Sequence, residues 1–201
     1  MHFNWYGYSS CKLQEGGVTV VIDPFKEGSA KSPRMAADLL LLSQPDFEEA
    51  ASSVSGDKFL IKGPGEYEVK GIFVTGLPIN GQTLFYIDVF GLKVVHLGRM
   101  NKSDLTDKQL EMVENCDVLI IPVGGHDTLN EKSAAALVNR IEPKIIVPIC
   151  HHVAALKDKY DPIDKFKKEV GMNGETVDKL SIKVKDIPQE ESKLYIVEAS
   201  V

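Results

Sequence analysis

Cysteine is scarce in this sequence, with three residues among 201. They are Cys11, Cys116 and Cys150, and their spacing matches neither a metal-binding pattern nor a set of disulfide pairs. An odd number of isolated cysteines is typical of a protein from a reducing compartment. The cysteines therefore predict a cytoplasmic protein without a disulfide framework.

Long apolar runs are also missing, since no segment approaches the roughly 20 residues that a membrane-spanning helix needs. The first residues show no basic leader followed by an apolar stretch. An excess of positive charge is absent too, because 23 Lys and Arg residues stand against 29 Asp and Glu residues and give a net charge of −6. This balance argues against a general affinity for nucleic acid or anionic membranes. We therefore expect a soluble protein that binds neither.

Several familiar catalytic signatures are not found: a Walker loop, a dinucleotide-binding fingerprint, and a set of serine, histidine and acid. Internal repeats and low-complexity tracts are also lacking. What is present is an ordinary globular composition, with 43% hydrophobic and 26% charged residues. A chain of this length can fill one core, so we expect residues 1–201 to form a single domain.

The stretch over residues 37–49, ADLLLLSQPDFEE, organises the chain. Its run of leucines after Asp38 predicts a strand that is buried on both faces. The strand should end near Gln44, because the following proline cannot donate to a sheet ladder. An acidic cluster, Asp46, Glu48 and Glu49, comes directly afterwards. Polar residues at the end of a buried strand are typical of a functional site in α/β proteins.

The remainder of the first half indicates mainly strands. Residues 18–22 form an apolar β-branched run, and a polar segment over Lys26–Arg34 indicates a loop. Asn80-Gly81 is the strongest two-residue hairpin signal, with strand patterns on both sides. These features predict a meander of antiparallel strands.

The second half alternates strands with helices. Thr106 and Gln109 form a capping box, which predicts a helix to about Glu114. Two apolar strands, DVLIIPV and KIIVPIC, flank a helix that Asn130 caps, so we expect a parallel crossover unit. The strands that end near Leu42, Ile121 and Ile149 should bring their C-terminal ends to one shared edge.

The order and spacing of several segments resemble the metallo-β-lactamase-fold hydrolases, in particular the small stand-alone branch labelled zinc-dependent hydrolases. The resemblance covers about residues 2–197, and it rests on WYGYSS, VVIDPF, ADLLLLS, GPGEYEVKGIFVTGLP, TLFYIDVFGLKVVHLG, DVLIIPVGG and EPKIIVPI. It implies an α/β fold, a four-layer αββα sandwich in which two mixed β-sheets pack face to face with helices on the outer faces. It also implies one or two zinc ions at the sheet ends.

The same resemblance shows that the family's metal ligands are replaced here. The signature His-x-His-x-Asp-His matches Gln44, Asp46, Glu48 and Glu49, which leaves no imidazole. Glutamine is a poor zinc ligand. A tight turn at Asn80-Gly81 stands where the family has a loop with a further histidine.

The two remaining ligand positions have also changed. The family's bridging aspartate follows His-Leu-Gly and matches Arg99, while its last histidine matches Cys150, with His151 one residue further on. A guanidinium is permanently cationic and does not bind a metal ion. We therefore expect Arg99 to replace the metal's charge and to pair with Asp46, Glu48 or Glu49; the alternative is a solvent-facing Arg99.

Other candidate residues have structural alternatives. His126 follows Gly124-Gly125 on a loop that borders the family's cleft, where it lines a pocket or faces solvent. His96 ends an apolar strand and is interpreted as a core histidine, and Cys150 as a buried, inert thiol. The acidic cluster is equally consistent with the start of a helix, where acids favour the N-terminal dipole.

Two functions follow from these residues. The first is a non-catalytic homologue, a pseudoenzyme without zinc that binds a small molecule or a protein. Its relic cleft would comprise Gln44, Asp46, Glu48, Glu49, Arg99, His126, Cys150 and His151. The second is a divergent metal-dependent hydrolase of the ester, lactone or phosphodiester type, in which Asp46, Glu48, Glu49 and His151 hold Mg²⁺ or Mn²⁺.

Overall fold

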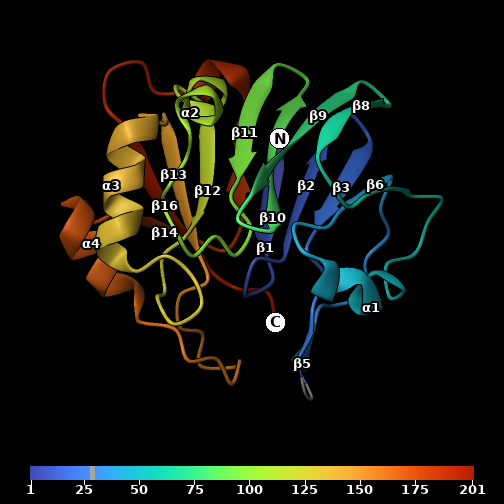
Figure 1. Cartoon of the computed structure of the whole chain (residues 1–201), viewed down its shortest axis with the longest axis horizontal. Coiled ribbons are helices and arrows are strands. Elements are labelled where there is room, and N and C mark those ends of the chain that lie inside the picture. The colour runs from blue at the N-terminus through green and yellow to red at the C-terminus, as the bar shows by residue number, and fades with distance from the viewer. Residues whose placement is uncertain (28–29) are drawn as a thin grey trace.

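The computed structural model describes residues 1–27 and 30–201, and it contains two β-sheets packed face to face (Figure 1). The first sheet has six strands, in the spatial order β15 (Leu180–Ser181), β1 (His2–Trp5), β2 (Cys11–Glu15), β3 (Val18–Ile22), β6 (Leu39–Leu41) and β7 (Phe59–Ile61). The second has eight strands, in the order β14 (Glu175–Val177), β16 (Lys193–Val197), β13 (Ile145–Ile149), β12 (Val118–Pro122), β11 (Leu92–His96), β10 (Gln82–Val89), β9 (Ile72–Ile79) and β8 (Gly65–Val69). Both sheets combine parallel and antiparallel pairs.

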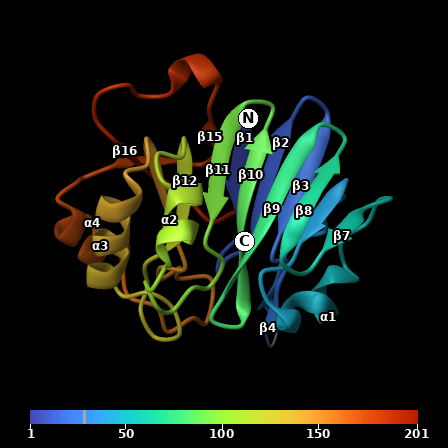
Figure 2. The same ribbon diagram turned by 45° about the horizontal axis from the view of Figure 1, so that its top comes forward.

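Helices lie on the outer faces of both sheets, which confirms the predicted αββα sandwich. The helices α2 (Asp107–Val113), α3 (Glu131–Ile141) and α4 (Ile163–Val170) cover the eight-stranded sheet. The six-stranded sheet has a thinner cover, made by the 3₁₀ turn η1 (Pro45–Phe47) and the short helix α1 (Glu48–Ala51). In Figure 2 these two segments lie at the opposite side of the molecule from α3 and α4.

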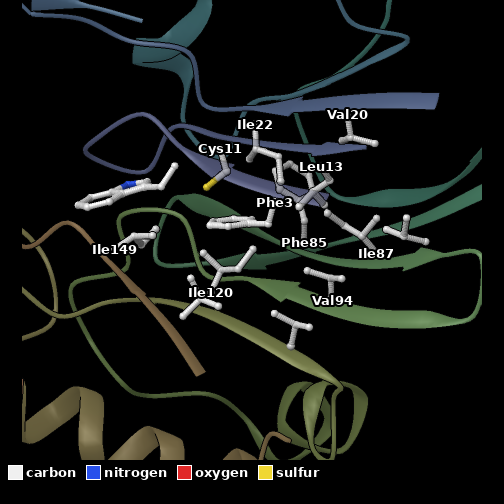
Figure 3. Packing of buried hydrophobic residues seen from close by; sticks show 14 of the residues in the cluster. Phe3, Cys11, Leu13, Val20, Ile22, Phe85, Ile87, Val94, Ile120 and Ile149 are labelled. Atoms are coloured by element: carbon white, nitrogen blue, oxygen red, sulfur yellow. The ribbon is translucent and has the colours of Figure 1, made fainter. Parts of the chain in front are cut away.

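The main core lies between the sheets. Figure 3 shows Phe3 and Leu13 of the first sheet facing Phe85 and Ile120 of the second. The leucines of β6 explain why the pattern predicted burial on both faces. Leu39 and Leu41 join the core between the sheets, whereas Leu40 and Leu42 pack under α1.

Local signals place the other elements as predicted. Asn80 and Gly81 have φ angles of 48° and 79°, as a tight hairpin turn requires, and they join β9 to β10. The Thr106–Gln109 capping box starts α2. The strands β12 and β13 are parallel neighbours joined through α3, whose Asn130 cap accepts a hydrogen bond from Ser133 N. The predicted crossover unit is confirmed.

The polar segment Lys26–Arg34 differs from a plain loop. Its described ends pair as the two-residue strands β4 (Lys26–Glu27) and β5 (Ala30–Lys31). Residues 28–29 lie outside the described part of the chain. The structure also adds β14 and a 3₁₀ turn η2 (Val184–Asp186), which the sequence patterns did not indicate.

Candidate functional site

Several strands bring polar residues to one edge of the sandwich. Asp23 follows β3 and Ser43 follows β6, and these two strands are parallel neighbours. In the second sheet, the turns after β12 and β13 meet: a Cβ on Gly124 would lie 1.9 Å from the carbonyl oxygen of Cys150. The N–H of Cys150 also donates to the carbonyl of Tyr8 (3.2 Å), on the turn that joins β1 to β2. This edge therefore joins both sheets.

Asp23 is the buried acid of this edge. Its carboxylate is fully buried and accepts hydrogen bonds from the backbone N and the Oγ of Ser43, each at 2.7 Å. Burial raises the pKa of Asp23 to about 6, and the bonds from Ser43 and the charge of Arg99 oppose that rise. Asp23 also adopts a left-handed backbone conformation, with φ at 47°. Sequence analysis missed this residue, although an aspartate between an apolar strand and a proline was a usable signal.

His96 lies beneath the edge as a satisfied core histidine, as its position predicted. Its Nδ1 accepts a hydrogen bond from Gly98 N (3.0 Å), which leaves Nε2 to donate to the carbonyl of Ser9 (3.1 Å). The Sγ of Cys11 is 3.4 Å from Nε2. Burial lowers the pKa of His96 to about 4. The ring is therefore neutral near pH 7, and both nitrogens are engaged.

Cys150 and His151 are adjacent in the sequence and both are buried, but their side chains have different surroundings. Burial raises the pKa of the Cys150 thiol far above its usual range, so this side chain is protonated. The ring of His151 packs against Trp5, with centroids 4.5 Å apart, and burial lowers its pKa to about 4. Neither residue presents a charged group.

The acidic cluster faces outward. Asp46 lies in η1, and Glu48 and Glu49 occupy the first turn of α1; all three are exposed. Glu48 binds Lys62 at 3.0 Å, and Glu49 binds Lys26, which lowers the pKa of that carboxyl. Gln44 is half-buried and precedes η1 in an extended conformation. The cluster thus forms a solvated start of a short helix, the structural alternative considered for it.

Arg99 has a different partner from the predicted ones. Its side chain, which is 18% exposed, forms an ion pair with Asp127 on the loop after β12. Its carbonyl oxygen accepts a hydrogen bond from Gln82 Nε2 (3.3 Å). The sequence analysis did not single out Asp127, because loop residues that meet Arg99 across the fold leave no local pattern.

A cavity of about 140 Å³ opens beside this ion pair. Arg99, Asp127 and His126 line it together with Tyr8 and residues 157–160 of the segment after β13. His126 is exposed and has a φ angle of 56°. It therefore lines the cavity from the solvent side.

Within the described part of the chain, no group of three or more histidine, cysteine, aspartate or glutamate side chains could hold a metal ion. The alternative set of Asp46, Glu48, Glu49 and His151 is not assembled, since its acids are exposed and its imidazole is buried against Trp5. Among the described residues, no helix is long and apolar enough to cross a membrane.

Comparisons with known proteins agree with the fold. The sequence profile of the family described as "Beta-lactamase superfamily domain" matches residues 2–150. A metal-dependent hydrolase from Natranaerobius thermophilus is 25% identical over 206 residues, covering 85% of this chain and 91% of the relative. One from Thermococcus onnurineus is 25% identical over 205 residues, covering 81% and 89%.

Solved structures give the same result. A metallo-beta-lactamase superfamily member from Thermotoga maritima superposes with a TM-score of 0.86 at 31% identity, covering 98% of this chain and 99% of the other. A metallo hydrolase from Ignicoccus hospitalis shares the fold with a TM-score of 0.67 at 15% identity, covering 98% and 95%.

Proposed function

The chain belongs to the beta-lactamase superfamily, and from this premise we propose that it is a non-catalytic member that serves as a binding or interaction protein. Its relatives are named metal-dependent hydrolases. The proposal therefore depends on the residues by which this chain differs from the family's metal-binding pattern.

Arg99 carries the proposal. The resemblance puts this residue where the family has a carboxylate between two metal ions, and the structure places its guanidinium in a partly buried position beside Asp127. A guanidinium keeps its charge at any ordinary pH and offers only donors. Such a group would repel a divalent cation at the bridge position, and it supplies positive charge there without a metal.

Several of the other candidate ligands fit zinc poorly. Zinc binds thiolate and neutral imidazole, but the raised pKa of Cys150 disfavours its thiolate. The ring nitrogens of His96 already have partners inside the fold. The exposed carboxylates of Glu48 and Glu49 bind lysines. The described residues therefore do not assemble a site at which zinc could take part in catalysis.

Metal content and hydrolysis test the proposal directly. Protein purified without chelator should contain far less than one zinc per chain by plasma emission. It should also hydrolyse ester, lactone and phosphodiester substrates no faster than heat-denatured protein, with Zn²⁺, Mg²⁺ or Mn²⁺ added. Stoichiometric zinc at a site that includes Asp46 or Glu49 would overturn the proposal.

A pair of variants separates the effect of Arg99 from that of the missing histidines. Gln44→His alone should not gain zinc, because the guanidinium of Arg99 remains. Gln44→His with Arg99→Asp should bind zinc more tightly than the single variant, since the second change replaces a cation by a carboxylate. Hydrolysis that requires Mg²⁺ or Mn²⁺ and is lost in Asp46→Asn would instead establish a divergent hydrolase.

A further inference from the structure

A cavity of about 370 Å³ lies at the opposite end of the strands from the polar edge. Two of its lining residues, Lys144 and Ser192, directly precede β13 and β16, which are parallel neighbours. The cavity therefore opens where these strands begin, whereas the polar edge follows the ends of β12 and β13. Because the two places are separate, what this cavity binds does not depend on Arg99 or on a metal ion.

The C-terminal ends of two helices line this cavity. Val138 and Asn139 belong to the last turn of α3, and Val170 is the last residue of α4. The two helices lie side by side on the eight-stranded sheet (Figure 1). A helix C-terminus carries the negative end of the helix dipole and favours a cation near its last turn. This part of the cavity therefore suits a positively charged group.

Charged side chains of both signs also line the cavity. Glu142, which follows the last residue of α3, and Glu190 supply carboxylates, and Lys144 supplies an ammonium group. The two glutamates are exposed and the lysine is half-buried. Within the described part of the chain, none of these three side chains takes part in an ion pair. A ligand can therefore contact both signs of charge without displacing an ion pair of the protein.

The cavity has an apolar lining as well, made by Val138, Ile146, Val170 and Met172. Val138 and Ile146 are buried, and the other two are half-buried. All four belong to the apolar cluster between the eight-stranded sheet and its helices or pack against it. The unbranched side chain of Met172 can adapt to ligands of different shape. A ligand that fits this lining therefore carries an apolar group beside its charges.

We propose that this cavity binds a free α-amino acid with an apolar side chain, such as leucine or methionine. The ammonium group of the amino acid donates to the carboxylates of Glu142 and Glu190, near the negative ends of α3 and α4. Its carboxylate accepts from the ammonium group of Lys144, and its side chain packs against the apolar lining. Hydrogen bonds between ionised groups are stronger than those between neutral groups. A zwitterion makes them with both signs of charge, which neither an amine nor a carboxylate can do.

Calorimetric titration of the full chain at pH 7, with leucine and with analogues that lack one of its charges, tests the proposal. Isopentylamine lacks the carboxylate and isocaproate lacks the ammonium group, so each should bind roughly tenfold more weakly than leucine or worse. Glycine, which lacks the apolar side chain, should also bind more weakly. An analogue that binds as tightly as leucine would overturn the assignment of ligand class. The absence of saturable binding of both leucine and methionine would overturn the proposal as a whole.

Variants of the charged residues provide the second arm. Lys144→Gln should weaken leucine binding roughly tenfold without weakening isopentylamine binding, because the amine has no carboxylate to pair with the lysine. Glu142→Gln with Glu190→Gln should weaken leucine binding without weakening isocaproate binding. Glu66→Gln, at an exposed position of β8, should change none of these affinities. A thermal melt of each variant checks that it is folded.

Two further results would contradict the proposed contacts. Equal losses for leucine and isopentylamine in Lys144→Gln would mean that the lysine only supports the shape of the cavity. The leucine titration should also give the same affinity with a chelator and with added zinc, because the cavity lies away from the polar edge. Leucine binding that requires zinc would place the amino acid at a metal ion and would overturn the inference.

Discussion

At the scale of single residues, burial affects the pKa values of the acid and the histidine at the polar edge more than ion pairing does. Asp23 and His96 are both fully buried, and burial shifts both pKa values toward the neutral form. Their partners are mostly uncharged hydrogen-bonding groups, Ser43 for the acid and Gly98 for the imidazole. The exposed acids of α1, by contrast, meet lysines in solvent. Burial therefore favours the uncharged forms of Asp23 and His96 at this edge.

Asp23 should make stability depend on pH in a defined direction. Its pKa is raised from 3.8 to about 6, so between these values the folded state binds more protons than the unfolded state. The contribution of Asp23 to stability therefore falls as pH rises from about 4 to about 6. At about 1.4 kcal/mol per pKa unit, the fall is about 3 kcal/mol.

Urea unfolding of the unaltered protein and Asp23→Asn, across that pH range, measures this effect. The difference between the two curves removes the contributions of His96 and His151, whose lowered pKa values act in the opposite direction. Asp23→Asn should gain stability relative to the unaltered protein as pH rises. A difference that stays constant with pH would contradict the prediction.

The ion pair between Arg99 and Asp127 should contribute little to stability. Asp127 is 43% exposed, and exposed pairs typically couple by about 1 kcal/mol or less. A double-mutant cycle with Arg99→Gln and Asp127→Asn should give a coupling of that size. The exposed pair of Lys62 and Glu48 serves as a control and should couple no more strongly. A coupling of several kcal/mol would contradict this prediction.

At the scale of elements, the turns after β12 and β13 approach each other closely at the polar edge. Gly124 lies so close to its neighbours that a Cβ there would meet the carbonyl oxygen of Cys150 at 1.9 Å and the Cβ of Tyr160 at 2.7 Å. The backbone N–H of Asp161 also donates to the carbonyl of Gly124 (2.8 Å). The φ angle of Gly124 is not in the left-handed region, so its backbone conformation does not require glycine. Glycine is needed at this position because there is no space for a side chain.

Gly124→Ala should therefore destabilise the protein by about 3 kcal/mol or more, since the added methyl group overpacks against backbone atoms. Thermal and urea unfolding measure the loss. Gly63→Ala is the matched control, because a Cβ at Gly63 has no heavy atom within 4 Å. If Gly124→Ala is as stable as Gly63→Ala, the two turns are not packed as described.

At the scale of the whole molecule, both sheets contribute to one core, and this predicts a single cooperative unit. Trp5 is the only tryptophan and is 99% buried, with its ring against His151, which follows β13 of the second sheet. Its fluorescence therefore reports contact between the sheets, while far-UV circular dichroism reports the strands and helices. The two signals should give the same urea midpoint. Separate midpoints would mean that residues 1–201 do not form one cooperative domain.

The sequence alone determined most of the elements and much of their order. Apolar runs such as the leucines of β6, the Asn80-Gly81 turn, and the caps at Thr106 and Asn130 act over a few residues, so each can be recognised without the fold. The ordered segments also indicated the family and its sandwich of two sheets. The resemblance also indicated that Arg99 is in register with the family's bridging aspartate, because it follows the short motif His96-Leu97-Gly98.

Only the tertiary structure decided which side chains meet. Asp127 and Arg99 are 28 positions apart, and Asp23 and Ser43 are 20 positions apart. Such contacts depend on how strands from two sheets end at one edge, which no local pattern records. The acidic cluster was predicted to turn inward to Arg99, but the turn at Pro45 and the lysines near α1 hold it at the surface. Exposing three carboxylates to solvent costs less free energy than burying them. Whether the fold exposes or buries them depends on the elements around them, and the sequence alone did not show how these are arranged.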